Sequence, residues 1–187
     1  MERRRSKCIK VGNIFVGGNS RISVQSMTNT DSADFDATYA QIKRLEEAGC
    51  DIVRMTVPDM DAVKTVGKLK ESDVNIPIVA DIHFDYKMAV EAANAGADKI
   101  RINPGNIGSD DKVKAVVDAC NLRNIPIRIG VNSGSLEKSI LEKHGRPSGE
   151  ALAESALYHA SLLEKFDFTN IILAVKSSRV GDMIKAN

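Results

Sequence analysis

The sequence has few of the features by which metal-binding, disulfide-stabilised or membrane proteins are recognised. Its three cysteines, which stand far apart and form no C-x-x-C pair, are Cys8, Cys50 and Cys120. Its three histidines, none at the i, i+4 spacing of a zinc-binding helix, are His83, His144 and His159. Cys50 and Cys120 fall at predicted helix ends in apolar surroundings, where a small buried thiol is the usual role. We therefore predict no metal site in this chain.

Long apolar runs and a dominant sign of charge are also absent. No stretch approaches the roughly 20 apolar residues of a membrane-spanning helix. The net charge is +1 at pH 7, so no global field favours nucleic acid or a membrane surface as a partner. Residues 1–7 are basic, but no apolar run of a signal peptide follows, so we interpret them as a solvated tail, with contact to an anionic partner as the alternative. These absences favour a cytoplasmic protein whose attraction for an anion is local.

What the chain does contain is a regular alternation of strand and helix patterns. With 187 residues and 43% hydrophobic content, it suits one globular domain. Two short alternating runs about Gly12-Asn13 predict a hairpin over residues 7–18, placed to plug the bottom of a barrel. Further strands are predicted at 24–29, 52–57, 76–82, 99–103, 125–131 and 171–176. Helices are predicted from Asp34 or Asp36 to Ala48 and at 60–71, 86–95, 110–123 and 148–166, the last two capped by Ser109 and Ser148.

An internal repeat distinguishes between the folds that such β-α units build. Residues 48–57 resemble 95–104, and residues 75–81 resemble 124–130, at offsets of 47 and 49 residues, about the length of two β-α units. Such a repeat is typical of an α/β chain of the (β/α)8 TIM-barrel type, whereas a doubly wound sheet reverses and does not require it. Six strands follow the hairpin, with only the beginning of a sixth helix. We therefore predict an incomplete barrel of about six β-α units over residues 24–187, the N-terminal portion of a longer barrel domain; an open six-stranded domain is the alternative.

Residues 99–108 read as a buried strand that ends in a phosphate-sized loop. Side chains alternate across a strand, so Ile100 and Ile102 share one face while Arg101 and Asn103 share the other. A guanidinium on the inner face is costly unless an anion meets it. The glycines of the loop let backbone N–H groups approach a ligand. The alternative is a structural arginine paired with a neighbouring aspartate.

The same alternation along the other strands turns a set of polar side chains inward near the carboxyl ends. This set is Arg54, Thr56, Asp81, His83, Arg101, Asn103, Arg128, Asn132 and Lys176. Its four cations come from four strands and meet at the mouth where barrel enzymes hold their active sites. Because these charges are too costly for a dry core, we predict a wet cleft for an anion with more than one phosphate group, which forked guanidinium groups suit. A structural Arg–Asp network, with Asp51 and Asp98 if the alternation is misassigned, is the alternative.

Two loops and two titratable residues complete the candidate site. Residues 103–108 lead into a helix whose N-terminus favours anions, and residues 131–135, which include Ser133, offer hydroxyls on a flexible backbone. Asp81 and His83 are candidates for proton transfer or for binding substrate hydroxyls. A packed, hydrogen-bonded His83 is the alternative. The other two histidines are assigned no role.

Five stretches, in order along the chain, resemble one known family. They are residues 24–30, 52–55, 79–84, 99–108 and 128–135. They resemble the 4-hydroxy-3-methylbut-2-en-1-yl diphosphate synthases, iron–sulfur enzymes of the non-mevalonate isoprenoid pathway, and the resemblance runs through essentially all 187 residues. The strings Asp-Ile-His-Phe and Arg-Ile-Asn-Pro-Gly-Asn-Ile-Gly are its most specific parts. It implies the reductive ring opening of 2-C-methyl-D-erythritol 2,4-cyclodiphosphate to 4-hydroxy-3-methylbut-2-enyl diphosphate.

The resemblance also implies roles for individual residues and for parts of the enzyme. Arg54, Arg101, Arg128 and Lys176 match phosphate-binding positions, Asn103 and Asn132 match polar substrate contacts, and Asp81 matches a residue near the substrate hydroxyls. Family members hold a [4Fe-4S] cluster through three cysteines and a glutamate of a C-terminal domain, which the cysteines of this chain do not match. The family implies flavodoxin or ferredoxin as electron donor, and a homodimer in which the cluster domain of one subunit closes over the barrel of the other. We therefore expect these residues alone to bind no cluster and to lack catalysis.

Two other functions compete with this one. Lys176 stands at the end of the sixth strand, a position that resembles the Schiff-base lysine of aldolases acting on phosphorylated sugars. Such a lysine needs a pKa lowered by burial or by neighbouring cations. The other alternative is a module that only binds a diphosphate or folds without activity.

Overall fold

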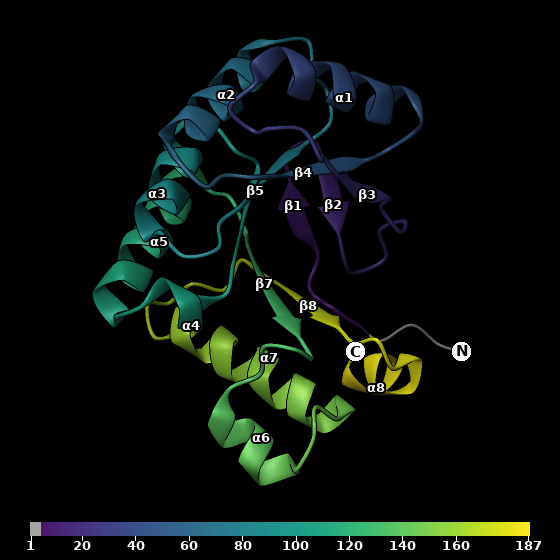
Figure 1. The fold of residues 1–187 in the computed structure, drawn as a ribbon, viewed down its shortest axis with the longest axis vertical. Helices are drawn as coiled ribbons and strands as arrows, with labels where there is room; N and C mark the ends of the chain where they lie inside the picture. The colour runs from purple at the N-terminus through teal and green to yellow at the C-terminus, as the bar shows by residue number, and fades with distance from the viewer. Residues whose placement is uncertain (1–4) are drawn as a thin grey trace.

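The computed structural model describes residues 5–187, and a curled sheet of parallel strands forms its centre (Figure 1). The strands, in spatial as well as chain order, are β3 (Gln25–Met27), β4 (Ile52–Thr56), β5 (Ile78–Asp81), β6 (Lys99–Ile102), β7 (Ile127–Asn132) and β8 (Ile171–Lys176). The helices between them cover the outer side of the sheet; they are α1 (Phe35–Glu47), α2 (Met60–Glu71), α3 (Tyr86–Asn94), α5 (Asp110–Arg123) and α7 (Gly149–Glu164), with α8 (Val180–Ala186) after β8. A strand order that never reverses is that of a (β/α)8 barrel and not of a doubly wound sheet. The predicted fold class, an incomplete TIM-type barrel, is therefore confirmed.

The predicted hairpin is also confirmed, with β1 (Ile9–Val11) antiparallel to β2 (Ile14–Val16). Its turn lies against the amino ends of the central strands: the Asn13 side chain donates to the backbone oxygen of Asn75 at 3.1 Å. At Gly12, where φ is +56°, a Cβ atom would stand 2.8 Å from Pro77 Cγ, so only glycine fits. The hairpin thus covers the bottom of the sheet, opposite to the carboxyl ends. Of the predicted basic tail, residues 1–4 lie outside the described part of the chain, and residues 5–7 are exposed.

Strand and helix ends follow local chemistry. β5 and β7 begin two residues later than predicted, after Pro77 and Pro126, because proline has no N–H to donate to a neighbouring strand. Asp34, not Asp36, caps α1, and its carboxylate accepts a hydrogen bond from the N–H of Ala37 at 3.0 Å. Ser148 caps α7 through Ala151. Ser109 occupies the N-cap position of α5 but makes no capping hydrogen bond with its side chain.

Two short helices were not predicted. Residues 103–108 contain α4 (Pro104–Ile107), which starts at a proline and whose N-cap Asn103 accepts a hydrogen bond from the N–H of Gly105 at 3.1 Å. The predicted strand consequently ends one residue early, at Ile102. The second helix, α6 (Lys138–His144), lies between β7 and α7. Helices of one or two turns are too short for a 3.6-residue periodicity to reveal them.

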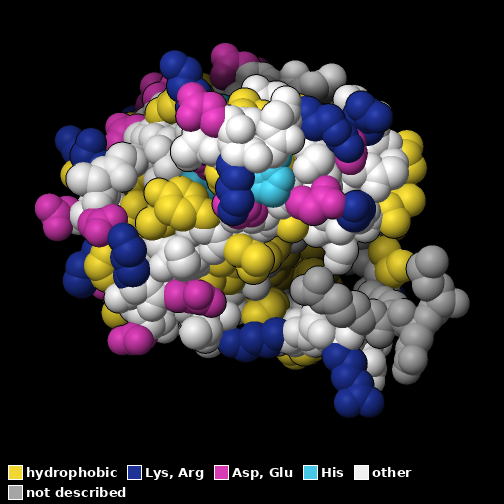
Figure 2. Space-filling view, turned by 90° about the horizontal axis from the view of Figure 1, so that it is seen from below, with side chains coloured by type: hydrophobic (Ala, Val, Ile, Leu, Met, Phe, Trp, Pro, Cys, Tyr) yellow, Lys and Arg dark blue, Asp and Glu magenta, His cyan; other side chains and the backbone are white. Residues whose placement is uncertain are grey.

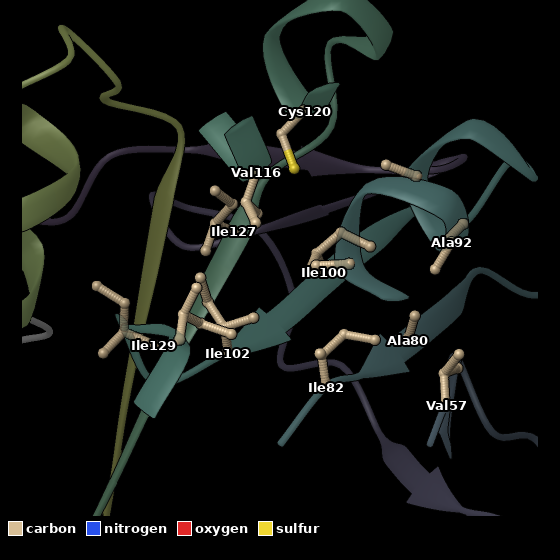
Figure 3. Close-up of a cluster of buried hydrophobic side chains, with 14 of the residues drawn as sticks. Val57, Ala80, Ile82, Ala92, Ile100, Ile102, Val116, Cys120, Ile127 and Ile129 are labelled. Carbon is tan, nitrogen blue, oxygen red and sulfur yellow. The ribbon is translucent and has the colours of Figure 1, made fainter. Parts of the chain in front are cut away.

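The core lies between the outer face of the sheet and the helices (Figure 3). Its labelled members from strands and their ends are Val57, Ala80, Ile82, Ile100, Ile102, Ile127 and Ile129, and those from α3 and α5 are Ala92, Val116 and Cys120. Each fully buried aliphatic side chain contributes about 1.5–3 kcal/mol. The predicted outward parity is confirmed for β4 to β7, whereas Leu173 of β8 is 40% exposed because β8 is an edge strand of the described sheet. Cys50 is buried like Cys120.

The molecular surface mixes both signs of charge. Figure 2, viewed from the side of α6 and α7, shows Lys and Arg interspersed with Asp and Glu and with small apolar groups. No patch of one sign covers this face, in keeping with the net charge of +1. Among residues 5–187, no helix combines the length and the apolar composition that crossing a membrane requires.

Candidate functional site

A cavity of about 450 Å³ opens at the carboxyl ends of the six parallel strands. Eight of the predicted site residues line it, namely Arg54, Asp81, His83, Arg101, Asn103, Arg128, Asn132 and Lys176. Strand register explains why they meet, since Arg101 lies beside both Asp81 and Arg128, and Asn132 lies beside Lys176. Two predicted residues, Thr56 and Ser133, are not among the lining residues: the Thr56 hydroxyl is hydrogen-bonded with that of Ser32 at 3.1 Å, and the Ser133 N–H donates to the Lys176 carbonyl oxygen at 3.0 Å.

Asp81 is the central carboxylate of the cavity and is only 3% exposed. Its Oδ1 accepts a hydrogen bond from Arg101 Nη1 at 2.9 Å. Its Oδ2 lies 3.5 Å from Arg54 Nε and 3.6 Å from His83 Nε2. One carboxylate therefore stands between two guanidinium groups and an imidazole, and the two guanidinium charges alone outnumber it.

The other two aspartates that sequence reasoning considered lie elsewhere. Asp51 binds Arg21, and Asp98 binds Lys70 with its Oδ2 2.8 Å from Nζ. Neither carboxylate contacts a cation of the cavity in the described part of the chain. Of the structural Arg–Asp network considered as the alternative, the pairing of Arg101 with Asp81 is present, whereas Asp51 and Asp98 take no part in it.

Arg128 has no carboxylate in ion-pair contact among the described residues. Its Nη1 donates to Gln25 Oε1 at 3.2 Å. Burial lowers the pKa of Arg128, the charges of Arg54 and Arg101 lower it further, and Asp81 opposes this effect. An arginine stays protonated in proteins, so Arg128 keeps a buried positive charge with no carboxylate in contact. Binding of an anion beside it is therefore favourable.

The guanidinium groups are also positioned by uncharged neighbours. Arg54 donates from Nε and Nη2 to Met27 Sδ, at 3.3 and 3.1 Å. Arg101 lies directly over Gly130 of the neighbouring strand, where a Cβ atom would stand 2.7 Å from both Nε and Nη2. A side chain at position 130 would therefore displace Arg101, so glycine is required for close approach and not for its backbone angles.

Lys99 is a cation of the inner face that sequence reasoning missed. It is 2% exposed, and its Nζ lies 3.4 Å from Gln25 Oε1, the same oxygen that Arg128 contacts. Burial, followed by the charges of Arg128 and Arg54, lowers its pKa to about 7. The signal was present, because Lys99 has the same parity as Arg101 two residues later. These contacts form a second layer of positive charge beneath the cavity.

The rim of the cavity is formed by loops. His83 is 52% exposed and Phe84 is 73% exposed, so His83 is not the packed histidine of the alternative reading. Asn106 of α4 and Ser135 after β7 also line the cavity; they belong to the two loops predicted to complete the site, although neither was singled out as a site residue. Backbone, amide, hydroxyl and imidazole groups of these loops thus surround the arginine and lysine side chains of the cavity. The arrangement can bind a small polyanion through its phosphates while leaving Asp81 and His83 beside its other groups.

The cysteines do not fit an iron–sulfur cluster, which needs several thiolates at one place. Cys8 is exposed, while Cys50 and Cys120 are buried. Burial raises the pKa of the Cys120 thiol to about 12, opposite to what a thiolate ligand requires. Within residues 5–187, no group of three or more His, Cys, Asp or Glu side chains is arranged to hold a metal ion. No chemical step through a cluster is derived from these residues.

Comparison with protein families gives a match over almost the whole chain. A profile described as the GcpE TIM-barrel domain matches residues 6–187. A protein of Clostridium perfringens named 4-hydroxy-3-methylbut-2-en-1-yl diphosphate synthase (flavodoxin) is 56% identical over 186 residues, which cover 100% of this chain and 53% of that protein. A protein of the same name from Pseudomonas paraeruginosa is 60% identical over 178 residues, 95% of this chain and 48% of that protein. The chain thus spans about half the length of these relatives.

Solved structures of distant sequence share the fold. A phospho-2-dehydro-3-deoxyheptonate aldolase of Thermotoga maritima is 14% identical with a TM-score of 0.64 and covers 90% of this chain and 45% of its own. A type I 3-dehydroquinate dehydratase of Clostridium difficile is 15% identical with a TM-score of 0.62 and covers 91% of this chain and 81% of its own. At this level of identity the likeness concerns the fold alone.

Proposed function

Because the chain belongs to the GcpE TIM-barrel family, we propose that it is part of the substrate-binding barrel of a 4-hydroxy-3-methylbut-2-en-1-yl diphosphate synthase. The proposed ligand is 2-C-methyl-D-erythritol 2,4-cyclodiphosphate, which the whole enzyme opens reductively to 4-hydroxy-3-methylbut-2-enyl diphosphate. The observation that carries this proposal is a cavity lined by Arg54, Arg101, Arg128 and Lys176 around a single buried carboxylate. Such a surplus of cations suits a diphosphate.

Each polar residue has a proposed role in binding. The three arginines and Lys176 hold the phosphate oxygens, and Asn103, Asn132 and Ser133 add uncharged hydrogen bonds. Asp81 and His83, in contact at 3.6 Å, are proposed to bind hydroxyl groups or move a proton at the ligand. Because the diphosphate keeps its charge through the reaction, the cations mainly position it and do not drive the chemistry.

The proposal extends to the whole enzyme as an iron–sulfur oxidoreductase. A [4Fe-4S] cluster, held by ligands outside this chain, would supply electrons. Flavodoxin or ferredoxin would reduce the cluster; the names of the relatives include flavodoxin. A homodimer and a cytoplasmic location belong to the same proposal. The residues described here contribute binding and orientation.

The aldolase alternative has less support. A Schiff-base lysine is activated by desolvation or by close cations, whereas Lys176 is exposed. The aldolase among the structural neighbours is only 14% identical and supports the fold alone. Borohydride trapping with sugar phosphates tests this alternative directly, since a covalent adduct at Lys176 would favour it.

Calorimetric titration of this chain with the cyclic diphosphate tests the proposal. We expect saturable binding that Arg54→Ala or Arg101→Ala weakens by about 30-fold or more, because each change removes a charged hydrogen-bond donor. Arg123→Ala, at the exposed end of α5, is the matched control and should bind like the parent. Absence of saturable binding by the folded chain, or parent-like affinity in both cavity variants, would overturn the proposal.

A further inference from the structure

A buried histidine and a glutamate on the outer side of the barrel have no part in the binding residues above. His159 lies on α7 and is 1% exposed, and its Nε2 lies against Oε1 of Glu137. Within residues 5–187, His159 Nδ1, His159 Nε2 and Glu137 Oε2 are buried without a hydrogen bond of normal geometry. Buried polar atoms left this way cost free energy. Because these two side chains lower the stability of the folded chain, we look for another role for them.

One side of the histidine contacts the loop after β6. A Cβ atom on Gly105 would stand 2.7 Å from His159 Cε1 and 3.5 Å from Nδ1, so the ring packs directly on the backbone of α4. In Figure 1, α4 lies beside α7, and the two helices are in contact. Gly105 in turn donates its N–H to Asn103, the residue that lines the cavity. The imidazole therefore supports the segment that carries Asn103 and Asn106.

The other side contacts the loop after β7. Glu137 is the N-cap residue of α6 and ends the segment that begins at Asn132. Along this segment, Asn132 and Ser135 line the cavity, and Ser135 donates its N–H to the Asn132 carbonyl oxygen at 3.1 Å. The contact of His159 on α7 with Glu137 therefore fixes the last residue of this segment, whose first residue, Asn132, lines the cavity.

We infer that His159 and Glu137 are positioning residues that hold the two cavity loops, residues 103–108 and 132–137, in the arrangement that binds the diphosphate. Neither residue lines the cavity, so they act through Asn103, Asn106, Asn132 and Ser135. The inference rests on the proposed function for its ligand. The link between the two loops does not depend on that function, because it is formed by the contacts of His159 with Gly105 and Glu137.

The test compares His159→Leu, which keeps volume but removes the ring nitrogens, with His159→Gln, which keeps a side-chain N–H donor. Cyclic diphosphate is titrated into each folded variant and into Glu137→Ala. We expect His159→Leu and Glu137→Ala to weaken binding about tenfold, a loss typical of coupled neighbours, and the double variant to lose no more than either alone. His159→Gln should recover most of the affinity.

His144 provides the matched control. It also pairs with a glutamate, with Nε2 2.8 Å from Glu154 Oε2, but that glutamate lies on α7 and not on a cavity loop. His144→Leu should therefore bind like the parent. Equal losses in His159→Leu, His159→Gln and His144→Leu would indicate general packing and overturn the inference, as would parent-like affinity in folded His159→Leu.

A second measurement separates this inference from the proposed function. Without ligand, backbone amide NMR signals of Asn103, Gly105 and Asn106 and of residues 132–135 should both shift in Glu137→Ala, although only the second segment is near the change in sequence. If the parent binds no diphosphate, the proposed function fails, and the amide signals alone decide the inference. Shifts confined to residues 132–138 would overturn it.

Discussion

Lys99 illustrates how a single residue can oppose stability in a site built from charge. It is buried beside Gln25 without a carboxylate in the described part of the chain, and the charges of Arg128 on the neighbouring strand β7 and of Arg54 on β4 act on it. Removing an ammonium from water costs several kcal/mol unless it is paired or loses its proton. The buried positive charge on the inner face of the sheet therefore lowers the free energy of unfolding.

Stability should rise with pH through this residue. Burial and the neighbouring arginines lower the pKa of Lys99 to about 7 in the folded chain, from its ordinary value of 10.5. Between these values the unfolded chain binds more protons, so raising the pH from 7 to 10 should increase the free energy of unfolding. Lys99→Met should remove this slope and raise the free energy of unfolding at pH 7 by about 2–4 kcal/mol. Denaturant titrations at several pH values measure both; identical pH slopes in parent and variant would contradict the assignment.

Gly130 makes a second prediction for a single residue. In Gly130→Ala, the new Cβ would stand 2.7 Å from Arg101 Nε and Nη2, so the guanidinium must leave its place beside Asp81. We expect diphosphate affinity to fall about tenfold or more. Gly181→Ala, where nothing lies within 4 Å, is the control. Unchanged affinity in Gly130→Ala, measured by calorimetry, would mean that Arg101 does not bind the ligand from this position.

The sequence predicted much of this site because strand parity is simple to read. It brought Arg54, Arg101, Arg128 and Lys176 to one mouth, and all four line one cavity. It missed Lys99 because a lysine at the first position of a strand usually extends to solvent. It missed the His159 contact because its partners, Gly105 and Glu137, are brought together only by tertiary packing. Side chains that act across elements leave no local pattern.

At the scale of elements, helix starts were predicted well because capping is local. Asp34 and Ser109 both occupy N-cap positions, but only the Asp34 side chain makes the capping hydrogen bond. Helix α4 escaped prediction because four residues show no periodicity. The strands that follow Pro77 and Pro126 were predicted to begin two residues too early, since the apolar pattern alone does not reveal a missing N–H.

The two caps give a paired prediction. Asp34→Ala removes an acceptor for the Ala37 N–H and should lower the free energy of unfolding by about 1 kcal/mol. Ser109→Ala removes no capping hydrogen bond and should cost only a few tenths of that amount. Thermal or urea unfolding of both variants measures the difference. Equal losses would show that the side-chain hydrogen bond is not what stabilises the start of α1.

At the scale of the whole molecule, the chain is nearly neutral, but its positive charge is concentrated at one cavity. The net charge is +1, and the outer face over α6 and α7 mixes both signs (Figure 2). The parallel order of strands gathers cations that are far apart in sequence, from Arg54 to Lys176, at one edge. This concentration follows from the fold and its parity, which is why the barrel type and the site were predicted together.

A crystal structure of this chain with the cyclic diphosphate tests the central claim most directly. The account predicts phosphate oxygens within about 3 Å of guanidinium nitrogens of Arg54, Arg101 and Arg128, inside the cavity at the carboxyl ends of the strands. A ligand bound among the outer helices, with these three side chains free of phosphate contacts, would contradict it.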